Sequence, residues 1–192
     1  MNTILQVEDV PNDVFFLQHA MKKLGIANPI QVASDGKQAI DYLKGNGKFS
    51  DRVKFPMPSL VLLDLKLPYV MGLEILKWIR LELSSSLVVI VLSASAEDTD
   101  IATAYRLGAN AFLTKPSEAS KLEDMVKAIR DFWLTQNMLP RESLPKPLRE
   151  PPAVIDFAAK ASVNGNGKIS KRRLLTSKRW VGAESPAQTV SR

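Results

Sequence analysis

Residues 60–68 read Leu-Val-Leu-Leu-Asp-Leu-Lys-Leu-Pro. The first four are apolar without alternation, which is typical of a central strand in a parallel sheet, where both faces are covered. Asp64 ends this run and has an apolar residue on either side. A buried charge is normally paired, bound to a metal or neutralised. Asp64 therefore either meets a cation or simply ends a strand at the edge of the sheet, and the remaining sequence distinguishes the two.

Composition excludes several kinds of site. The chain has 192 residues, which suits one domain with an extension or two small domains. Because there is no cysteine, disulfides and thiolate metal sites are excluded. The single histidine, His19, excludes a zinc site with several histidines, and we expect it to be exposed on the polar side of a helix. No apolar run is long enough to span a bilayer and no basic leader precedes one, so we expect a cytoplasmic protein.

The net charge of +6 is concentrated in the C-terminal part of the chain. Residues 1–140 contain 15 Lys and Arg against 16 Asp and Glu, whereas residues 141–192 contain 11 against 4. Prolines recur from Pro140 onward and the hydrophobic periodicity ends there. We therefore predict a folded domain over residues 1–139, and a Pro-rich linker with a basic, disordered tail over residues 140–192. Basic clusters in this tail would suit nucleic acid, so a DNA-binding regulator remains the alternative function, although no helix-turn-helix pattern is present.

Strand and helix patterns alternate five times along the first 136 residues. Short apolar or β-branched runs predict strands at Thr3–Val7, Ile30–Ala33, 60–64, 87–92 and Ala111–Thr114. Each is followed by apolar residues spaced three and four apart, which indicates an amphipathic helix. Pro11 begins the first helix and Ser117 is expected to cap the last. This alternation predicts an α/β fold of the (βα)5, flavodoxin-like kind: a doubly wound five-stranded parallel sheet with helices on both faces.

Polar residues follow the predicted strands at their carboxyl ends, where functional residues of such sheets gather. They are Glu8, Asp9, Asp64, Ser93 and Lys115. Three carboxylates a few ångströms apart repel one another and become tolerable around a divalent cation. An all-oxygen set with few ligands suits Mg²⁺, which keeps several waters and binds phosphate, and a lysine with a hydroxyl beside it suits a phosphoryl group. Alone, the acidic pair would be read as helix-capping residues and Lys115 as a solvated lysine.

This pattern of strand-end residues resembles the response-regulator receiver domain, of the same CheY-like type as the chemotaxis receiver. The resemblance implies that Asp64 accepts a phosphoryl group from a histidine kinase, which makes the chain a phosphoacceptor switch and not an enzyme. It also implies that Glu8, Asp9 and Asp64 hold Mg²⁺, with the backbone carbonyl of Lys66 as a further ligand. A phosphatase-like hydrolase with Asp64 as nucleophile is the rival enzyme class, but no insertion is large enough for its substrate pocket.

The resemblance assigns further roles around the phosphoryl group. Ser93 would move towards a phosphoryl oxygen, and Lys115 would pair first with Asp64 and then with its phosphate. Phe112 takes the position of the family's switch aromatic, and the alternative is a plain core aromatic. The peptide bond between Lys115 and Pro116 is expected to be cis.

Three motifs look similar to stand-alone receivers that partner bacterial phytochromes: the Glu8-Asp9 pair, the sequence around Asp64 and the Asp-Phe-Trp-Leu run at residues 131–134. That similarity implies a phytochrome-type kinase as partner and a homodimer through the fourth and fifth helices. Phe132 and Trp133 would then pack either on their own domain or on a second subunit.

The chain departs from the usual receiver pattern in the loops beside the site. Val10 replaces a common asparagine, and Met71 stands before Gly72 where many members have aspartate. Lys66 is unusual in its charge, and we hypothesise that its ammonium reaches over the phosphoryl group and alters the hydrolysis of the acyl phosphate.

Overall fold

The computed structural model describes residues 2–83 and 86–138. Within them, five strands form one parallel sheet in the order β2-β1-β3-β4-β5. The strands are β1 (Thr3–Val7), β2 (Ile30–Ala33), β3 (Pro58–Asp64), β4 (Val88–Ser93) and β5 (Ala111–Thr114). The predicted (βα)5 fold is therefore confirmed. The linker and basic tail predicted at residues 140–192 lie outside the described residues.

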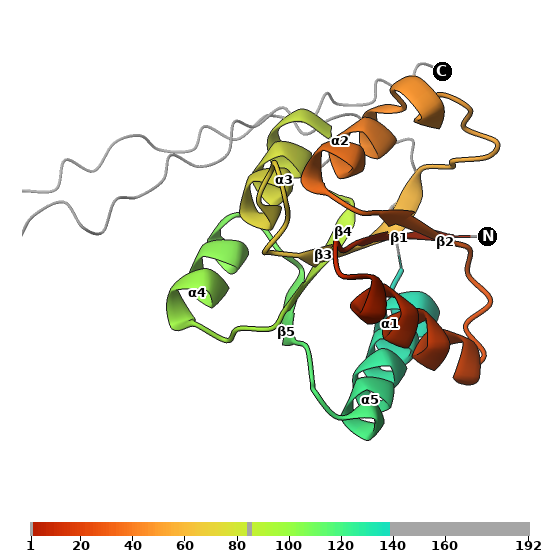
Figure 1. Ribbon diagram of the computed structural model, residues 1–192, viewed down its shortest axis with the longest axis vertical. Coiled ribbons are helices and arrows are strands. Elements are labelled where there is room, and N and C mark those ends of the chain that lie inside the picture. Colours follow the sequence, from red (N-terminus) through yellow and green to blue (C-terminus); the bar gives the residue numbers. More distant parts are fainter. Residues whose placement is uncertain (1, 84–85, 139–192) are drawn as a thin grey trace, which may run out of the picture. The chain divides into compact units, whose positions relative to one another are not determined.

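The helices cover both faces of the sheet. They are α1 (Pro11–Lys23), α2 (Gly36–Lys44), α3 (Gly72–Trp78), α4 (Asp98–Arg106) and α5 (Ala119–Ile129). Figure 1 shows α1 and α5 together on one face, and α2, α3 and α4 on the other. Two apolar cores follow from this division: Leu17, Ile90 and Val126 are buried in the α1–α5 core, and Val61, Ile75 and Ala104 in the other.

Successive side chains along the central strands point to opposite faces of the sheet and so contribute to both cores. In β3, Val61 and Leu63 point to the α2–α3–α4 side, whereas Leu60 and Leu62 point to the α1–α5 side. This is why residues 60–63 are apolar without a polar alternate position. The strand starts at Pro58, two residues earlier than expected, because Pro58 pairs with Thr3 of β1 beyond a shift in the register.

The predicted start of the first helix is confirmed, but the predicted cap of the last helix is wrong. Pro11 occupies the first turn of α1, and the Asp35 side chain accepts a hydrogen bond from the Gln38 N–H at the start of α2. Ser117 does not cap α5, because the helix begins one residue later, with Glu118 at its N-cap and no side-chain capping bond. α3 and α5 continue as wider π-helical turns over Ile79–Leu83 and Arg130–Gln136.

The direction of the chain changes between β1 and β3. From β1 it moves outward to β2 and then returns past β1 to β3, β4 and β5. In open parallel sheets this switch point leaves a crevice beyond the carboxyl ends of the strands, where ligands bind. Glu8 and Asp64 stand at the ends of these two strands. Among the described residues, none of the helices has the length and apolar character required to cross a membrane.

Candidate functional site

Four strand ends place the predicted site residues at one edge of the sheet. Val7 of β1 is in register with Leu63 of β3, so Glu8 and Asp64 follow at the same level. Ser93 ends β4 opposite Thr114 of β5. Because parallel pairing keeps these strand ends level, residues that are far apart in sequence come together.

The carboxylates of Glu8, Asp9 and Asp64 form an acidic cluster, in which one oxygen from each residue lies within 4.8 Å of the others. Glu8 and Asp64 are buried, at 3% and 6% exposure, and Asp9 is partly exposed. All the donors are oxygens, and three acids in so small a space repel one another. The cluster therefore fits a divalent cation that prefers oxygen ligands.

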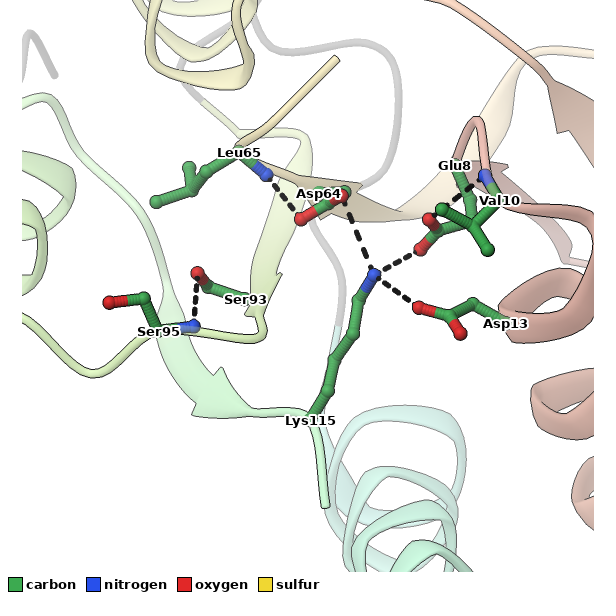
Figure 2. Close-up of polar contacts among 8 residues, drawn as sticks. All are labelled: Glu8, Val10, Asp13, Asp64, Leu65, Ser93, Ser95 and Lys115. Atoms are coloured by element: carbon green, nitrogen blue, oxygen red, sulfur yellow. Dashed lines mark hydrogen bonds and ion pairs between the residues drawn. The ribbon is translucent and has the colours of Figure 1, made fainter. Parts of the chain in front are cut away.

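The ammonium of Lys115 is shared by three carboxylates. It donates to Glu8 Oε2 and to Asp13 Oδ2, the latter at 3.0 Å, and lies 3.5 Å from Asp64 Oδ2. Figure 2 shows the lysine side chain reaching across the strand ends to these three oxygens. The predicted pairing of Lys115 with Asp64 is present, but the ammonium is closer to the β1–α1 side.

Asp13 was not among the residues predicted from the sequence. It lies in the first turn of α1, where an acid is also explained by the helix dipole. The signal that would have found it is its place in the first turn of the helix that directly follows β1, because helical side chains tilt towards the N-terminal end of their helix.

Burial and the lysine act in opposite directions on the acids. Burial raises the pKa of Asp64 and of Glu8 above the ordinary values, and the Lys115 ammonium partly offsets this. Burial alone would lower the pKa of Lys115, but its hydrogen bonds to Glu8 and Asp13 outweigh that effect and raise it. Lys115 therefore stays charged, and the ionised form of the buried acids needs further positive charge.

The backbone after β3 fixes Asp64 itself. The Leu65 N–H donates to Asp64 Oδ1 at 2.7 Å. The carbonyl of Leu65 in turn accepts a 3.0 Å hydrogen bond from the Gly72 N–H, which closes the loop between β3 and α3. Tyr69 in this loop has a φ of 66° and its side chain stands 87% exposed. Lys66 is exposed next to Asp64.

Ser93 and Phe112 lie on the two neighbouring strands β4 and β5. Ser93 is 1% exposed, and its hydroxyl accepts a 3.2 Å hydrogen bond from the Ser95 N–H (Figure 2). Phe112 is partly buried against the α2–α3–α4 core, and its N–H donates to the Tyr105 hydroxyl of α4 at 3.3 Å. The Tyr105 contact was not predicted.

The peptide bond between Lys115 and Pro116 is trans, and no cis peptide bond occurs among the described residues. The predicted cis bond is therefore wrong in this structure. Only about 0.5–1 kcal/mol separates the two forms before proline, so local sequence cannot decide between them and the surrounding loop does.

Trp133 and Phe132 have different environments, which partly resolves the alternative left by the sequence. Trp133 packs on the α1–α5 core of its own domain. Phe132 makes an edge-to-face contact with the Trp133 ring and is 51% exposed. His19 is exposed on α1, as predicted, and stacks on Phe15.

Comparisons with known proteins identify relatives over most of the described chain. The family model described as "Response regulator receiver domain" matches residues 4–127. The chain is 37% identical over 141 residues to the probable methanogenesis regulatory protein FilR2 of Methanothrix harundinacea, covering 71% of this chain and 86% of the relative. It is 34% identical over 138 residues to the response regulator Rcp1 of Synechocystis, covering 71% and 92% respectively.

Two solved structures extend these similarities to three dimensions. The Mn²⁺-bound form of Rcp1 superposes with a TM-score of 0.66 at 33% identity, covering 73% of this chain and 100% of that one. The phosphorylated cyanobacterial phytochrome response regulator RcpA gives 0.67 at 34% identity, covering 73% and 99%. These similarities confirm the resemblance that was inferred from the motifs.

Proposed function

The chain belongs to the family of response regulator receiver domains, and from this membership we propose that Asp64 is the residue that accepts the phosphoryl group. The chain is thus the receiver domain of a two-component response regulator. In the proposed step, a carboxylate oxygen of Asp64 attacks phosphorus and the P–N bond to the kinase histidine breaks. The histidine nitrogen leaves with the bonding electron pair, and because the other ring nitrogen carries a proton, the products are an acyl phosphate on Asp64 and a neutral histidine.

The observation that carries this proposal is the surroundings of Asp64. Its carboxylate is buried at the end of β3, is oriented by the Leu65 N–H, and lies 3.5 Å from the Lys115 ammonium. An anionic nucleophile attacking an anionic phosphoryl group needs positive charge close by to stabilise the transition state. Lys115 supplies one such charge, and its raised pKa keeps it protonated.

The divalent cation at the acidic cluster is proposed to be Mg²⁺. Glu8, Asp9 and Asp64 would hold it, with the backbone carbonyl of Lys66 as a further ligand. The small number of carboxylates supports Mg²⁺, which usually keeps several waters and binds through one or two carboxylates together with phosphate oxygens. When bound, the ion supplies charge neutralisation for the phosphoryl oxygens. The Mn²⁺-bound form of the relative Rcp1 supports the binding of a divalent ion.

Ser93, Lys115 and Phe112 are proposed to couple phosphorylation to the surface. The Ser93 hydroxyl and the Lys115 ammonium would bind phosphoryl oxygens. Phe112 would respond by repacking against α4, and the present bond between its N–H and the Tyr105 hydroxyl links β5 to that helix.

The proposed partner is a histidine kinase of the phytochrome type. The related protein RcpA is a phytochrome response regulator, which supports a partner of this kind. Exposed aromatic side chains lie beside the site on α1, where Phe15 and Phe16 are 62% and 55% exposed. Such side chains suit contact with another protein.

A homodimer through α4 and α5 remains a proposal. The half-exposed Tyr105 of α4, and Phe132 in the turn that follows α5, provide apolar area for it. Light scattering of the wild type and of Phe132→Ser, before and after phosphorylation, tests it. A monomer under both conditions would refute it.

The phosphoacceptor is tested by incubating the protein with acetyl phosphate and Mg²⁺ and measuring the intact mass. The wild type is expected to gain the mass of one phosphoryl group, and Asp64→Asn is expected to gain none. Asp35→Asn is the matched control, since Asp35 follows β2 at the same edge but serves as the N-cap of α2. An unmodified wild type, or a modified Asp64→Asn, would contradict the proposal.

A further inference from the structure

Asp13 differs from the other two partners of Lys115. Glu8 and Asp64 both belong to the acidic cluster that fits a divalent cation, whereas Asp13 does not. Its carboxylate lies 3.0 Å from the ammonium on the α1 side of the site. Lys115 thus contacts two candidate metal ligands and one carboxylate that is not a candidate metal ligand.

The lysine and a divalent cation need the same oxygens. Lys115 is a hydrogen-bond donor to Glu8 and an ion-pair partner of Asp64, and both carboxylates are nearly inaccessible to water. A cation bound at these oxygens repels an ammonium that stays on them. The lysine side chain is only 17% exposed, so its ammonium is held mainly by protein groups and not by solvent. When a cation binds Glu8 and Asp64, the Asp13 carboxylate is the partner that is still available to the Lys115 ammonium.

We propose that Asp13 is a positioning residue that acts through Lys115: by holding the ammonium, it reduces the competition between the lysine and a divalent cation for Glu8 and Asp64. This inference rests on the proposed metal site. Asp13 is suited to the task because its carboxylate lies 3.0 Å from the ammonium and stands outside the acidic cluster. It is also anchored in the first turn of α1, beside the end of β1 (Figure 2).

Two simpler roles for Asp13 predict different results. As a first-turn acid it would stabilise α1 through the helix dipole and have no specific effect on metal affinity. As a nearby negative charge it would attract the cation directly, whether or not Lys115 is present. Only action through Lys115 makes the effect of Asp13 depend on the lysine, and a double-mutant cycle measures that dependence.

The experiment is calorimetric titration of Mg²⁺ into the wild type, Asp13→Asn, Lys115→Met and the double variant. We expect Asp13→Asn to weaken binding about tenfold in the wild-type background and no more than about twofold in the Lys115→Met background. Asp13→Glu should restore most of the affinity, because it returns the charge. Asp98→Asn is the matched control, since it removes a first-turn acid from α4 without touching Lys115.

The outcomes separate this inference from the proposed function. Equal effects of Asp13→Asn in both backgrounds would overturn the action through Lys115 and leave the metal site intact. An unchanged affinity of Asp13→Asn would do the same. A wild type that binds no Mg²⁺ would overturn the metal site and this inference together. Circular dichroism of each variant confirms that the changes are read on folded protein.

Discussion

A β-carbon added at Gly72 would lie 2.1 Å from the backbone carbonyl oxygen of Asp64 and 2.7 Å from the Cα of Leu65. Gly72 begins α3, so the helix start rests directly on the backbone that carries the proposed phosphoacceptor. Glycine is required at this position because the backbone of Asp64 and Leu65 comes too close for a side chain. The backbone angle of Gly72 is not left-handed, so conformational strain is not the reason.

Gly72→Ala is therefore expected to displace the loop after β3 and destabilise the domain. The neighbouring atoms are backbone, which cannot turn aside, so we expect a loss of about 1–3 kcal/mol in the free energy of unfolding. Urea unfolding measures it. Gly25→Ala is the control for a glycine with positive φ and no atom within 4 Å of the added carbon, and it should cost about 1 kcal/mol. A smaller loss for Gly72→Ala than for this control would contradict the steric explanation.

The raised pKa of Asp64 predicts how stability depends on pH without metal. The folded protein holds the Asp64 proton more tightly than the unfolded chain, whose carboxyl has a pKa near 3.8. Stability is therefore lost as the pH rises from that value through the raised pKa, and each tenfold difference in proton affinity corresponds to about 1.4 kcal/mol.

Asp64→Asn should consequently be more stable than the wild type at pH 7 in EDTA, and the difference should disappear as the pH falls to about 4. Urea unfolding at a series of pH values measures it. Asp124→Asn, at an exposed position of α5, serves as the control for the loss of one carboxylate. A difference between Asp64→Asn and the wild type that grows towards low pH would show that burial does not dominate at Asp64.

Asp9→Asn separates repulsion from metal binding. Removing one charge from the acidic cluster should stabilise the metal-free protein, because the three carboxylates repel one another. Added Mg²⁺ should then stabilise the wild type more than the variant, since binding at 100 times Kd contributes about 2.7 kcal/mol. Thermal melting with and without Mg²⁺ measures both effects. Equal Mg²⁺ shifts in the two proteins would contradict the assigned ligands.

Lys66→Asn tests the unusual charge beside Asp64. An exposed ammonium next to the acyl phosphate would pair with its oxygens and hinder the approach of water, so the variant should lose phosphate about 2- to 10-fold faster. The decay of the phosphorylated form, followed by intact mass, measures this. Lys66→Arg, which keeps the charge, should decay at nearly the wild-type rate. The same lifetime in the wild type and Lys66→Asn would refute the hypothesis.

Tyr69→Asn tests the backbone strain in the loop between β3 and α3. A left-handed backbone costs most L residues about 1–2 kcal/mol, and asparagine tolerates it better. Since the tyrosine is 87% exposed, we expect the variant to gain up to about 1 kcal/mol in the free energy of unfolding. Tyr69→Ala removes the same ring but keeps the strain, so it should gain nothing. Equal effects of the two substitutions would show that the ring matters instead of the backbone.

The sequence by itself determined the sheet and the main members of the site. Unbroken apolar runs such as residues 60–63 require burial on both faces, and helices between the strands require parallel pairing. Once the strands are parallel, Glu8, Asp64 and Ser93 must lie at one edge. These conclusions depend on local patterns, which is why they are readable without the structure.

Only the tertiary structure decided which atoms touch. The ammonium of Lys115 meets Asp13, 102 positions away, because β5 and α1 are brought together by packing that no local pattern encodes. The approach of Gly72 to Asp64, the left-handed Tyr69 and the trans bond before Pro116 are likewise set by how the loops close. The energies that separate these arrangements are a few kcal/mol or less, and they are fixed by contacts between distant segments.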